Sequence, residues 1–273
     1  MRYRKLDGLR GLTIISMVAY HLLWDMNFIF GAGMAWYSAA PGYIWQQSIC
    51  WSFILLSGFC ASLASERRLS GLLRGLEIFG AGALVTLATV LFMPQDRIIF
   101  GVLTLVGSCK LLEWALHPLL KKPHPAAGTA VSLALFVVTR HVADGFIGIP
   151  ADPHLILAEN ILPEALSGSG TLPGLTLRLP AALYSNYLSA FFGFPFNGFY
   201  STDYFSLIPW IFLYMAGFYL QLLGSGSRAA KMLEDGLSRP LEWLGRKSFI
   251  IYLLHQPLIY ALLYLFYNIS FSS

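Results

Sequence analysis

Residues 1–30, MRYRKLDGLRGLTIISMVAYHLLWDMNFIF, join a basic start to an apolar run long enough to cross a membrane. Four ionisable side chains interrupt the run: Asp7, Arg10, His21 and Asp25. An α-helix turns about 100° and rises about 1.5 Å per residue, so Arg10 and His21 share a face at a separation of roughly 16 Å. Asp25 lies about one turn beyond His21, and Asp7 nearly one turn before Arg10. Because ionisable groups in a membrane normally face a protein interior or a wet cavity, this stripe predicts the start of a transmembrane active site.

The composition is that of a polytopic membrane protein. Of the 273 residues, 56% are hydrophobic and only 12% are charged, about half the charged share of a soluble domain, and the mean hydropathy is +0.63. The small net charge of +4 is spread between apolar runs, which excludes the basic patch of a nucleic-acid-binding protein. The first run is too long for a cleaved signal peptide and carries charges.

The three cysteines, Cys50, Cys60 and Cys109, all fall within apolar runs. They show no metal-ligand spacing, so we expect buried free thiols and no metal site.

Apolar runs near the roughly 20 residues of a membrane span occur in seven places. They are residues 10–31, 46–65, 72–93, 98–118, 127–147, 204–224 and 248–269. The expected fold class is an all-α, polytopic transmembrane helix bundle of about seven spans, in a single domain over residues 1–273. A short, Gly- and Pro-broken stretch at 180–196 is either an interfacial or re-entrant segment or an eighth span.

Basic residues alternate between the two sets of connections. One set contains Arg2, Arg4, Lys5, Arg67, Arg68, Arg74, Lys121, Lys122, Arg228, Lys231, Arg239, Arg246 and Lys247. The other set contains only Arg97, Arg140 and Arg178. The positive-inside rule therefore predicts a cytoplasmic N-terminus, and seven spans place the C-terminus outside. The long segment 148–203 then faces outward, where it could form a lid or wall above the bundle.

The side chains of the first helix suit acid–base chemistry. His21 takes up a proton near neutral pH, and a carboxylate one turn away, Asp25, can orient it. Arg10, with Asp7 beside it at the cytoplasmic end, offers a permanent cation for a phosphate or carboxylate. The alternative is structural: Arg10 anchors the helix at the interface, and His21 bonds to a neighbouring helix.

The motif Asp7-Gly-Leu-Arg10-Gly11, with ten residues between Arg10 and His21, resembles the signature of the acyltransferase type 3 membrane family. The wider pattern resembles the heparan-alpha-glucosaminide N-acetyltransferase-like family of bacterial membrane proteins. The resemblance rests on LDGLRGLTIISMVAYHLLWD at the start, IIFGVLTLVGSCKLL at 98–112, STDYFSLIPWIFLYMAGFYL at 201–220 and LGRKSFIIYLLHQPLIY at 244–260.

The resemblance implies a protein of the bacterial inner membrane that takes an acetyl group from cytoplasmic acetyl-CoA. The acceptor it implies is a carbohydrate or another small molecule on the opposite face. Arg10 and His21 match the motif arginine and histidine. The resemblance extends to animal members of the glucosaminide branch, which use a histidine in the loop after the first helix; residues 31–50 contain none. If the chemistry is shared, His21 has to carry it, and a glucosaminide acceptor does not follow.

The last apolar run contains a second polar cluster. Tyr252, His255 and Gln256 lie at positions i, i+3 and i+4, so they share one face, where they could line a substrate cavity. Pro257 would free the carbonyl of Leu253 and kink the helix. The alternative is that His255 and Gln256 are hydrogen-bonding glue between helices.

Two further candidates lie at the ends of spans. Asp203 is expected at the outer mouth, where an acceptor would arrive; alternatively Thr202 or Asp203 caps the next helix and Trp210 anchors it at the interface. Arg246 and Lys247 could clamp the phosphates of coenzyme A, although topology alone already favours basic residues there.

The leading functional hypothesis is an integral membrane acyltransferase, in which His21 is the general base or a transient acyl carrier and Asp25 orients it. A small transporter or proton-coupled carrier that uses the same charges is the alternative, and a non-catalytic scaffold is a third. The expected partners are the lipid bilayer, the acyl-CoA donor and the acceptor. The sequence leaves open the acceptor, the acyl chain length and the oligomeric state, and it is compatible with a homo-oligomer.

Overall fold

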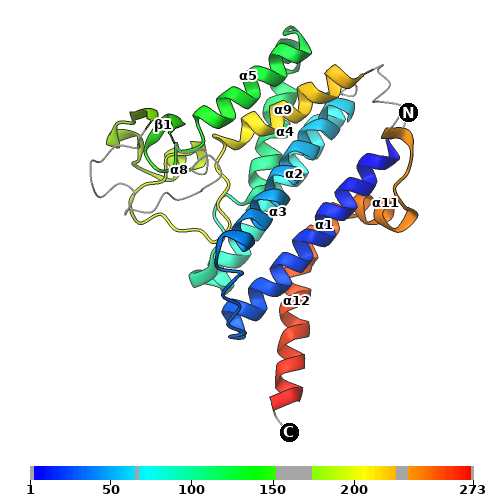
Figure 1. Cartoon of the computed structure of the whole chain (residues 1–273), viewed down its shortest axis with the longest axis vertical. Helices are drawn as coiled ribbons and strands as arrows, with labels where there is room; N and C mark the ends of the chain where they lie inside the picture. Colours follow the sequence, from blue (N-terminus) through cyan, green and yellow to red (C-terminus); the bar gives the residue numbers. More distant parts are fainter. Residues whose placement is uncertain (1–2, 65–67, 152–173, 226–232, 272–273) are drawn as a thin grey trace. The chain divides into compact units, whose positions relative to one another are not determined.

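The computed structural model describes residues 3–64, 68–151, 174–225 and 233–271, and these form two units. The first unit contains residues 1–56 and 224–273, and the second contains residues 57–223. The boundary falls within helix α2 (Ala40–Ala64). Each unit is mostly helical, as the composition predicted (Figure 1).

The first unit is built on α1 (Arg4–Trp24), its continuation η1 (Asp25–Ile29), α11 (Arg239–Arg246) and α12 (Ser248–Phe271). Residues of α1 and α12 pair in ascending order, from Arg10 with Ser248 to His21 with His255, so the two helices run in the same direction. An apolar cluster of Ile14, Met17, Ile49 and their neighbours packs α1 against α2 and α12.

Glycines allow α11 to approach the start of α1 closely (Figure 1). A Cβ atom on Gly11 would overlap the backbone carbonyl of Leu241, and one on Gly245 would overlap the carbonyl of Asp7. Ser238 caps α11 by accepting a hydrogen bond from the amide of Leu241. The short helix is thereby fixed against the cytoplasmic end that the sequence predicted for α1.

The second unit contains α3 (Arg68–Phe92) and α4 (Val102–Leu120), which form an antiparallel pair. Small residues permit this contact, because a Cβ atom on Gly82 would meet Thr104 and one on Gly107 would meet Phe79. The unit also contains η2 (Pro94–Asp96), α5 (Pro125–Val138) and α9 (Trp210–Gly224).

A small sheet is an exception to the all-α prediction. Strand β1 (Phe146–Pro150) pairs antiparallel with β2 (Gly174–Arg178), with Phe146 opposite Arg178. The sheet lies within the long segment expected to face outward, whose residues 152–173 lie outside the described part of the chain. The sequence signal was weak because each strand has only five residues.

The stretch at 180–196 does not form an eighth span, which was one of its two interpretations. This stretch contains η3 (Ala181–Leu183) and the six-residue α8 (Tyr187–Phe192). Six helical residues extend only about 9 Å, far less than the roughly 30 Å of a bilayer core.

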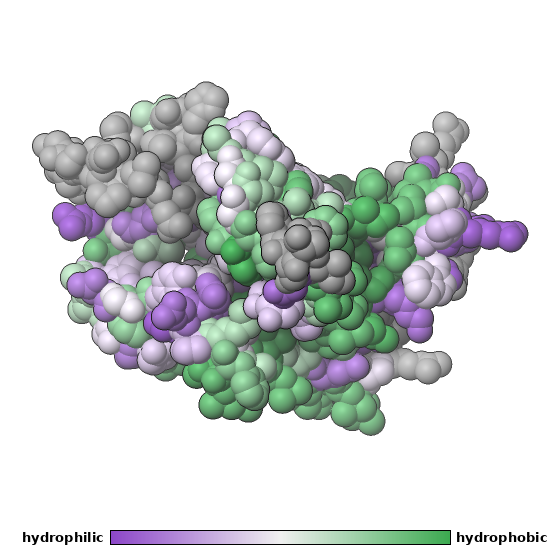
Figure 2. Space-filling view, turned by 90° about the horizontal axis from the view of Figure 1, so that it is seen from below, coloured by the Kyte–Doolittle hydropathy of each residue, from purple (hydrophilic) through white to green (hydrophobic). Residues whose placement is uncertain are grey.

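Within the residues that the structure describes, four helical segments are long and apolar enough to cross a membrane: Arg4–Ile29, Ala40–Leu63, Leu69–Phe92 and Ser248–Asn268. The apolar helices α5 and α9 are shorter, and α4 carries Lys110, Glu113 and His117. Large apolar side chains are exposed along these segments, for example Leu84, Phe92 and Leu262, and Figure 2 shows broad hydrophobic areas on the surface. Such surfaces suit a lipid environment.

Candidate functional site

The polar stripe of α1 lies partly within a helical irregularity. Asp25 is the first residue of the π-helical turn η1 and is fully buried. Single π-turns within α-helices frequently occur at functional sites, because they redirect one side chain relative to the regular helix. The stripe therefore ends at a carboxylate that the backbone turns into the protein interior.

The Asp25 carboxylate is hydrogen-bonded to a side chain of α12, and not to His21, its expected partner on α1. The Nε2 amide of Gln256 donates a hydrogen bond of 2.7 Å to Asp25 Oδ1. In the described part of the chain Asp25 Oδ2 has no hydrogen-bond partner. The interpretation that Asp25 orients His21 through a hydrogen bond is thus not supported by these contacts. The physical reason is that the π-turn directs the carboxylate towards α12.

His21 meets α12 through its ring. The imidazoles of His21 and His255 lie edge to face, with centroids 4.8 Å apart and planes at 62°. His255 is buried, and its Nδ1 lies 2.6 Å from the carbonyl oxygen of Tyr252. The structure therefore brings together the catalytic candidates of the first helix, His21 and Asp25, and the substrate candidates of the last, Tyr252, His255 and Gln256.

The N-terminal end of the same helix pair is rich in hydrogen-bond donors. Arg10 Nη2 donates a hydrogen bond of 2.6 Å to Ser248 Oγ at the start of α12. Arg246 and Lys247, which end α11 and join it to α12, are exposed. Asp7 is half-buried, and its backbone carbonyl contacts α11 at Gly245. Arg10, Arg246 and Lys247 thus belong to one short stretch of the α1, α11 and α12 assembly.

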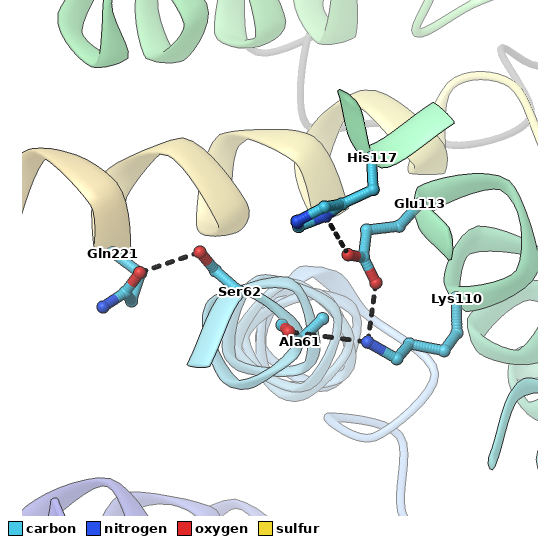
Figure 3. Close-up of polar contacts among 6 residues, drawn as sticks. All are labelled: Ala61, Ser62, Lys110, Glu113, His117 and Gln221. Atoms are coloured by element: carbon cyan, nitrogen blue, oxygen red, sulfur yellow. Dashed lines mark hydrogen bonds and ion pairs between the residues drawn. The ribbon is translucent and has the colours of Figure 1, made fainter. Parts of the chain in front are cut away.

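A buried ionic cluster on α4 was missed from the sequence (Figure 3). Lys110 Nζ lies 2.6 Å from Glu113 Oε2, and His117 Nδ1 lies 3.0 Å from Glu113 Oε1. Lys110 also donates to the carbonyl of Ala61, in the last turn of α2, where a cation is favourable. Nearby Ser62 donates to Gln221 of α9. The available signal was the spacing of 110, 113 and 117, which places three ionisable groups on one helical face.

A second overlooked pair follows α5. His141 Nδ1 lies 3.0 Å from Asp144 Oδ2, and both groups are largely buried. Burial and the charge of Asp144 raise the pKa of Tyr184 to about 12, so this phenol stays neutral at physiological pH. The sequence showed these charges as an interruption of the fifth run, and the structure gives the reason: α5 ends at Val138.

The residues before α9 correct two interpretations. The helix begins at Trp210, so neither Thr202 nor Asp203 is its N-cap; the Thr202 hydroxyl donates to the carbonyl of Asp96. Trp210 is buried against Phe136, and it is therefore not an interfacial anchor. Asp203 is half-buried and belongs to the second unit.

Cys50, Cys60 and Cys109 are free, as expected, although only Cys109 is fully buried. Within the described ranges, no group of three or more His, Cys, Asp or Glu side chains could hold a metal ion. The polar side chains at the contact of α1 and α12 are two histidines, a carboxylate and an amide.

Apolar helices of membrane-spanning length, with His21, buried His255 and buried Asp25 where two of them meet, define a membrane-embedded protein with a polar centre. The family model of the catalytic domain of heparan-alpha-glucosaminide N-acetyltransferase matches residues 2–257, nearly the whole chain. The chain therefore belongs to this family, whose named activity is acetyl transfer to an amine. No curated protein and no solved structure matches the chain significantly.

Proposed function

We propose that this protein is an integral membrane acetyltransferase that uses cytoplasmic acetyl-CoA and acetylates an acceptor on the opposite face. The observation that carries the proposal is the meeting of His21, Asp25, His255 and Gln256 within an otherwise apolar helix pair. Buried polar groups of this kind are costly in a membrane and mark functional sites. The family supports the reaction class.

The donor binds at the cytoplasmic end in this proposal. Arg10 uses one of its five N–H donors on Ser248, so its guanidinium can still bind a phosphate. Exposed Arg246 and Lys247 add two positive charges on the adjoining turn. From Arg10 to His21 the helix rises about 16 Å, a span that the extended pantetheine arm bridges to present the thioester to the histidines.

The reaction centre is the contact between His21 and His255. The acceptor nitrogen or oxygen attacks the thioester carbonyl, its proton passes to a histidine, and the thiol of coenzyme A leaves. An amine or hydroxyl of an amino sugar is the acceptor class we propose. Because residues 31–50 contain no histidine, the proton transfer that animal relatives are thought to assign to that loop is assigned here to α1 and α12.

The parallel arrangement of α1 and α12 supports the topology. If both helices cross the membrane in the same direction, the total number of crossings is odd. The four long spans alone do not satisfy this condition. Seven spans do, with α4, α5 and α9 as the remaining crossings, and the distribution of basic residues then places the N-terminus in the cytoplasm of a bacterial inner membrane.

The test is turnover by the purified protein in detergent or nanodiscs. Coenzyme A thiol release is measured with acetyl-CoA and either an amino sugar, a neutral sugar or no acceptor. We expect release that depends on the acceptor, is lost in the double variant His21→Ala with His255→Ala, and persists in Leu12→Ala, whose side chain is exposed on α1. Wild-type protein that releases no thiol with any acceptor, but exchanges protons or solutes across vesicles, would replace the enzyme with the carrier hypothesis.

A further inference from the structure

The hydrogen bond of His255 determines which of its nitrogens is basic. The acceptor of the 2.6 Å contact with Nδ1 is the backbone carbonyl of Tyr252, and a carbonyl oxygen only accepts. Nδ1 therefore carries the hydrogen, and in the neutral ring Nε2 has the lone pair. Nε2 is buried and, among the residues that the structure describes, has no hydrogen-bond partner. The neutral imidazole of His255 is therefore in the tautomer whose Nε2 can accept a proton.

The orientation of Gln256 follows from its partner in the same way. A carboxylate accepts hydrogen bonds, so the NH₂ group of Gln256 faces Asp25 and its Oε1 points elsewhere. Gln256 Oε1 and Asp25 Oδ2 are both buried without a hydrogen-bond partner in the described part of the chain. Both atoms are acceptors.

The acceptor cluster consists of Asp25 Oδ2 and Gln256 Oε1, on two hydrogen-bonded side chains, and His255 Nε2, on the residue before Gln256 in α12. None of the three atoms has a hydrogen-bond partner among the described residues. Buried polar atoms are rarely left unpaired without a functional reason. A carbonyl or a phosphate brings only acceptors and would be repelled here. A neutral amine brings two N–H donors, one for His255 Nε2 and one for Asp25 Oδ2 or Gln256 Oε1. The cluster thus matches the nucleophile of the acceptor substrate, and the donor-rich end at Arg10 matches the anionic cosubstrate.

From this polarity we propose that His255, through Nε2, is the general base of the transfer, and that His21 is a positioning residue. The proposal rests on the proposed function and refines it. Asp25 or Gln256 accepts a hydrogen bond from the second N–H of the substrate amine. The His21 ring, packed edge to face, limits the rotation of His255. This reassigns to α12 the role that the sequence motif suggested for α1.

The proton and bond changes balance without a further reactant. The amine nitrogen bonds to the acetyl carbonyl carbon while the carbon–sulfur bond breaks, and one N–H proton passes to His255 Nε2. The resulting imidazolium donates from both nitrogens, and the buried carboxylate of Asp25 is the nearby negative charge. The proton then passes to the thiolate, which yields the acetamide and free coenzyme A.

The discriminating variant is His255→Asn, compared with His21→Asn. An asparagine amide can still donate to the carbonyl of Tyr252, but it cannot accept a proton. We expect His255→Asn to lower kcat by about 100-fold or more with little change in KM for acetyl-CoA, and imidazole in solution to restore part of the rate. His21→Asn should lose less than about 10-fold, and Leu254→Ala, exposed on α12, should be unaffected.

The pH profile provides a readout that a merely structural role would not change. The described titratable groups whose rings contact His255 are His21 of α1 and Tyr252 of its own helix, and Asp25 of η1 is hydrogen-bonded to the adjacent Gln256. In the wild type the rate rises with pH as the base loses its proton. That rise should disappear in His255→Asn and persist in His21→Asn, while thermal unfolding and acetyl-CoA binding show that both variants are folded.

The outcomes separate the two proposals. An active wild type whose His255→Asn variant keeps its rate and its pH dependence would overturn the assignment of the base and leave the acetyltransferase intact. Loss of the pH dependence in His21→Asn alone would return the role of base to His21. A wild type that neither binds acetyl-CoA nor acetylates any amine would overturn both.

Discussion

Half-buried Gln256 of α12 donates a 2.7 Å hydrogen bond to buried Asp25 of η1, a residue 231 positions away in the sequence. This bond and the His21–His255 ring contact connect the first and last apolar helices into one polar centre. The arginine–histidine motif lies entirely on α1, yet the groups that complete it come from α12. Both helices are therefore needed to form the site.

Removing the amide should destabilise the first unit. Gln256→Leu leaves the buried Asp25 carboxylate without its described donor, which costs about 1–3 kcal/mol. Thermal unfolding in detergent should show a lower Tm than for wild type. The double variant Asp25→Leu with Gln256→Leu should recover part of the loss, because no buried polar group is left unpaired. Equal Tm values for wild type and Gln256→Leu would mean that the bond contributes nothing.

The ionic cluster on α4 makes a second stability prediction. Lys110→Met leaves Glu113 buried with only His117 as an ion-pair partner, and breaking a buried pair costs about 3–5 kcal/mol. Adding Glu113→Gln should recover much of this loss, since the uncompensated charge disappears. Lys121→Met, at an exposed position just after α4, is the control. A loss as small as that of the control would show that water or lipid headgroups reach the cluster.

The close approach of α1 and α11 is tested at a glycine. Gly11→Ala places a Cβ atom against the backbone carbonyl of Leu241 and should cost about 1–3 kcal/mol. Gly80→Ala, in α3 where a Cβ atom meets nothing within 4 Å, should instead stabilise by roughly 0.5–1 kcal/mol. Chemical or thermal unfolding shows whether each variant has a lower or a higher free energy of unfolding than the wild type. A stabilising Gly11→Ala would show that α11 moves aside at little cost.

Much of the fold could be predicted from hydropathy. The seven apolar runs correspond to α1, α2, α3, α4, α5, α9 and α12, and four helical segments have the length and composition of a span. The predicted end of the fifth run and the predicted start of the sixth run were wrong. Periodicity does not detect that α5 stops before Arg140 or that α9 starts only at Trp210. The two strands have only five residues each, too few for an alternation of apolar and polar residues to indicate them.

The sequence identified the residues of the candidate site on the first and last helices, but it predicted only part of the contacts between them. Spacing identified His21, Asp25, His255 and Gln256, because ionisable and amide groups stand out in apolar helices. It could not identify which pairs form, since a π-turn of five residues changes the direction of Asp25. The Lys110–Glu113 pair was overlooked because opposite charges three residues apart leave the run apolar on average.

The parallel direction of α1 and α12 gives a topology prediction. Reporter fusions should place the N-terminus in the cytoplasm and the C-terminus on the opposite face, as an odd number of spans requires. Two reporters are used, one active only in the cytoplasm and one active only outside. Each reporter is fused to the N-terminus in one variant and to the C-terminus in another, so that the two reporters control for each other. Both ends on the same side would contradict the parallel crossing of the two helices.

The most direct test of the account is calorimetric titration of the purified protein with acetyl-CoA, comparing wild type with Arg10→Ala. The guanidinium is proposed to bind a phosphate, so its loss should weaken binding by about 10-fold or more. Arg178→Ala, which removes an exposed positive charge from β2 in the second unit, should bind like wild type. Acetyl-CoA binding that falls only in Arg10→Ala places the donor at the cytoplasmic end of α1. A wild type that does not bind acetyl-CoA, or an Arg10→Ala variant of unchanged affinity, would contradict the proposed donor site.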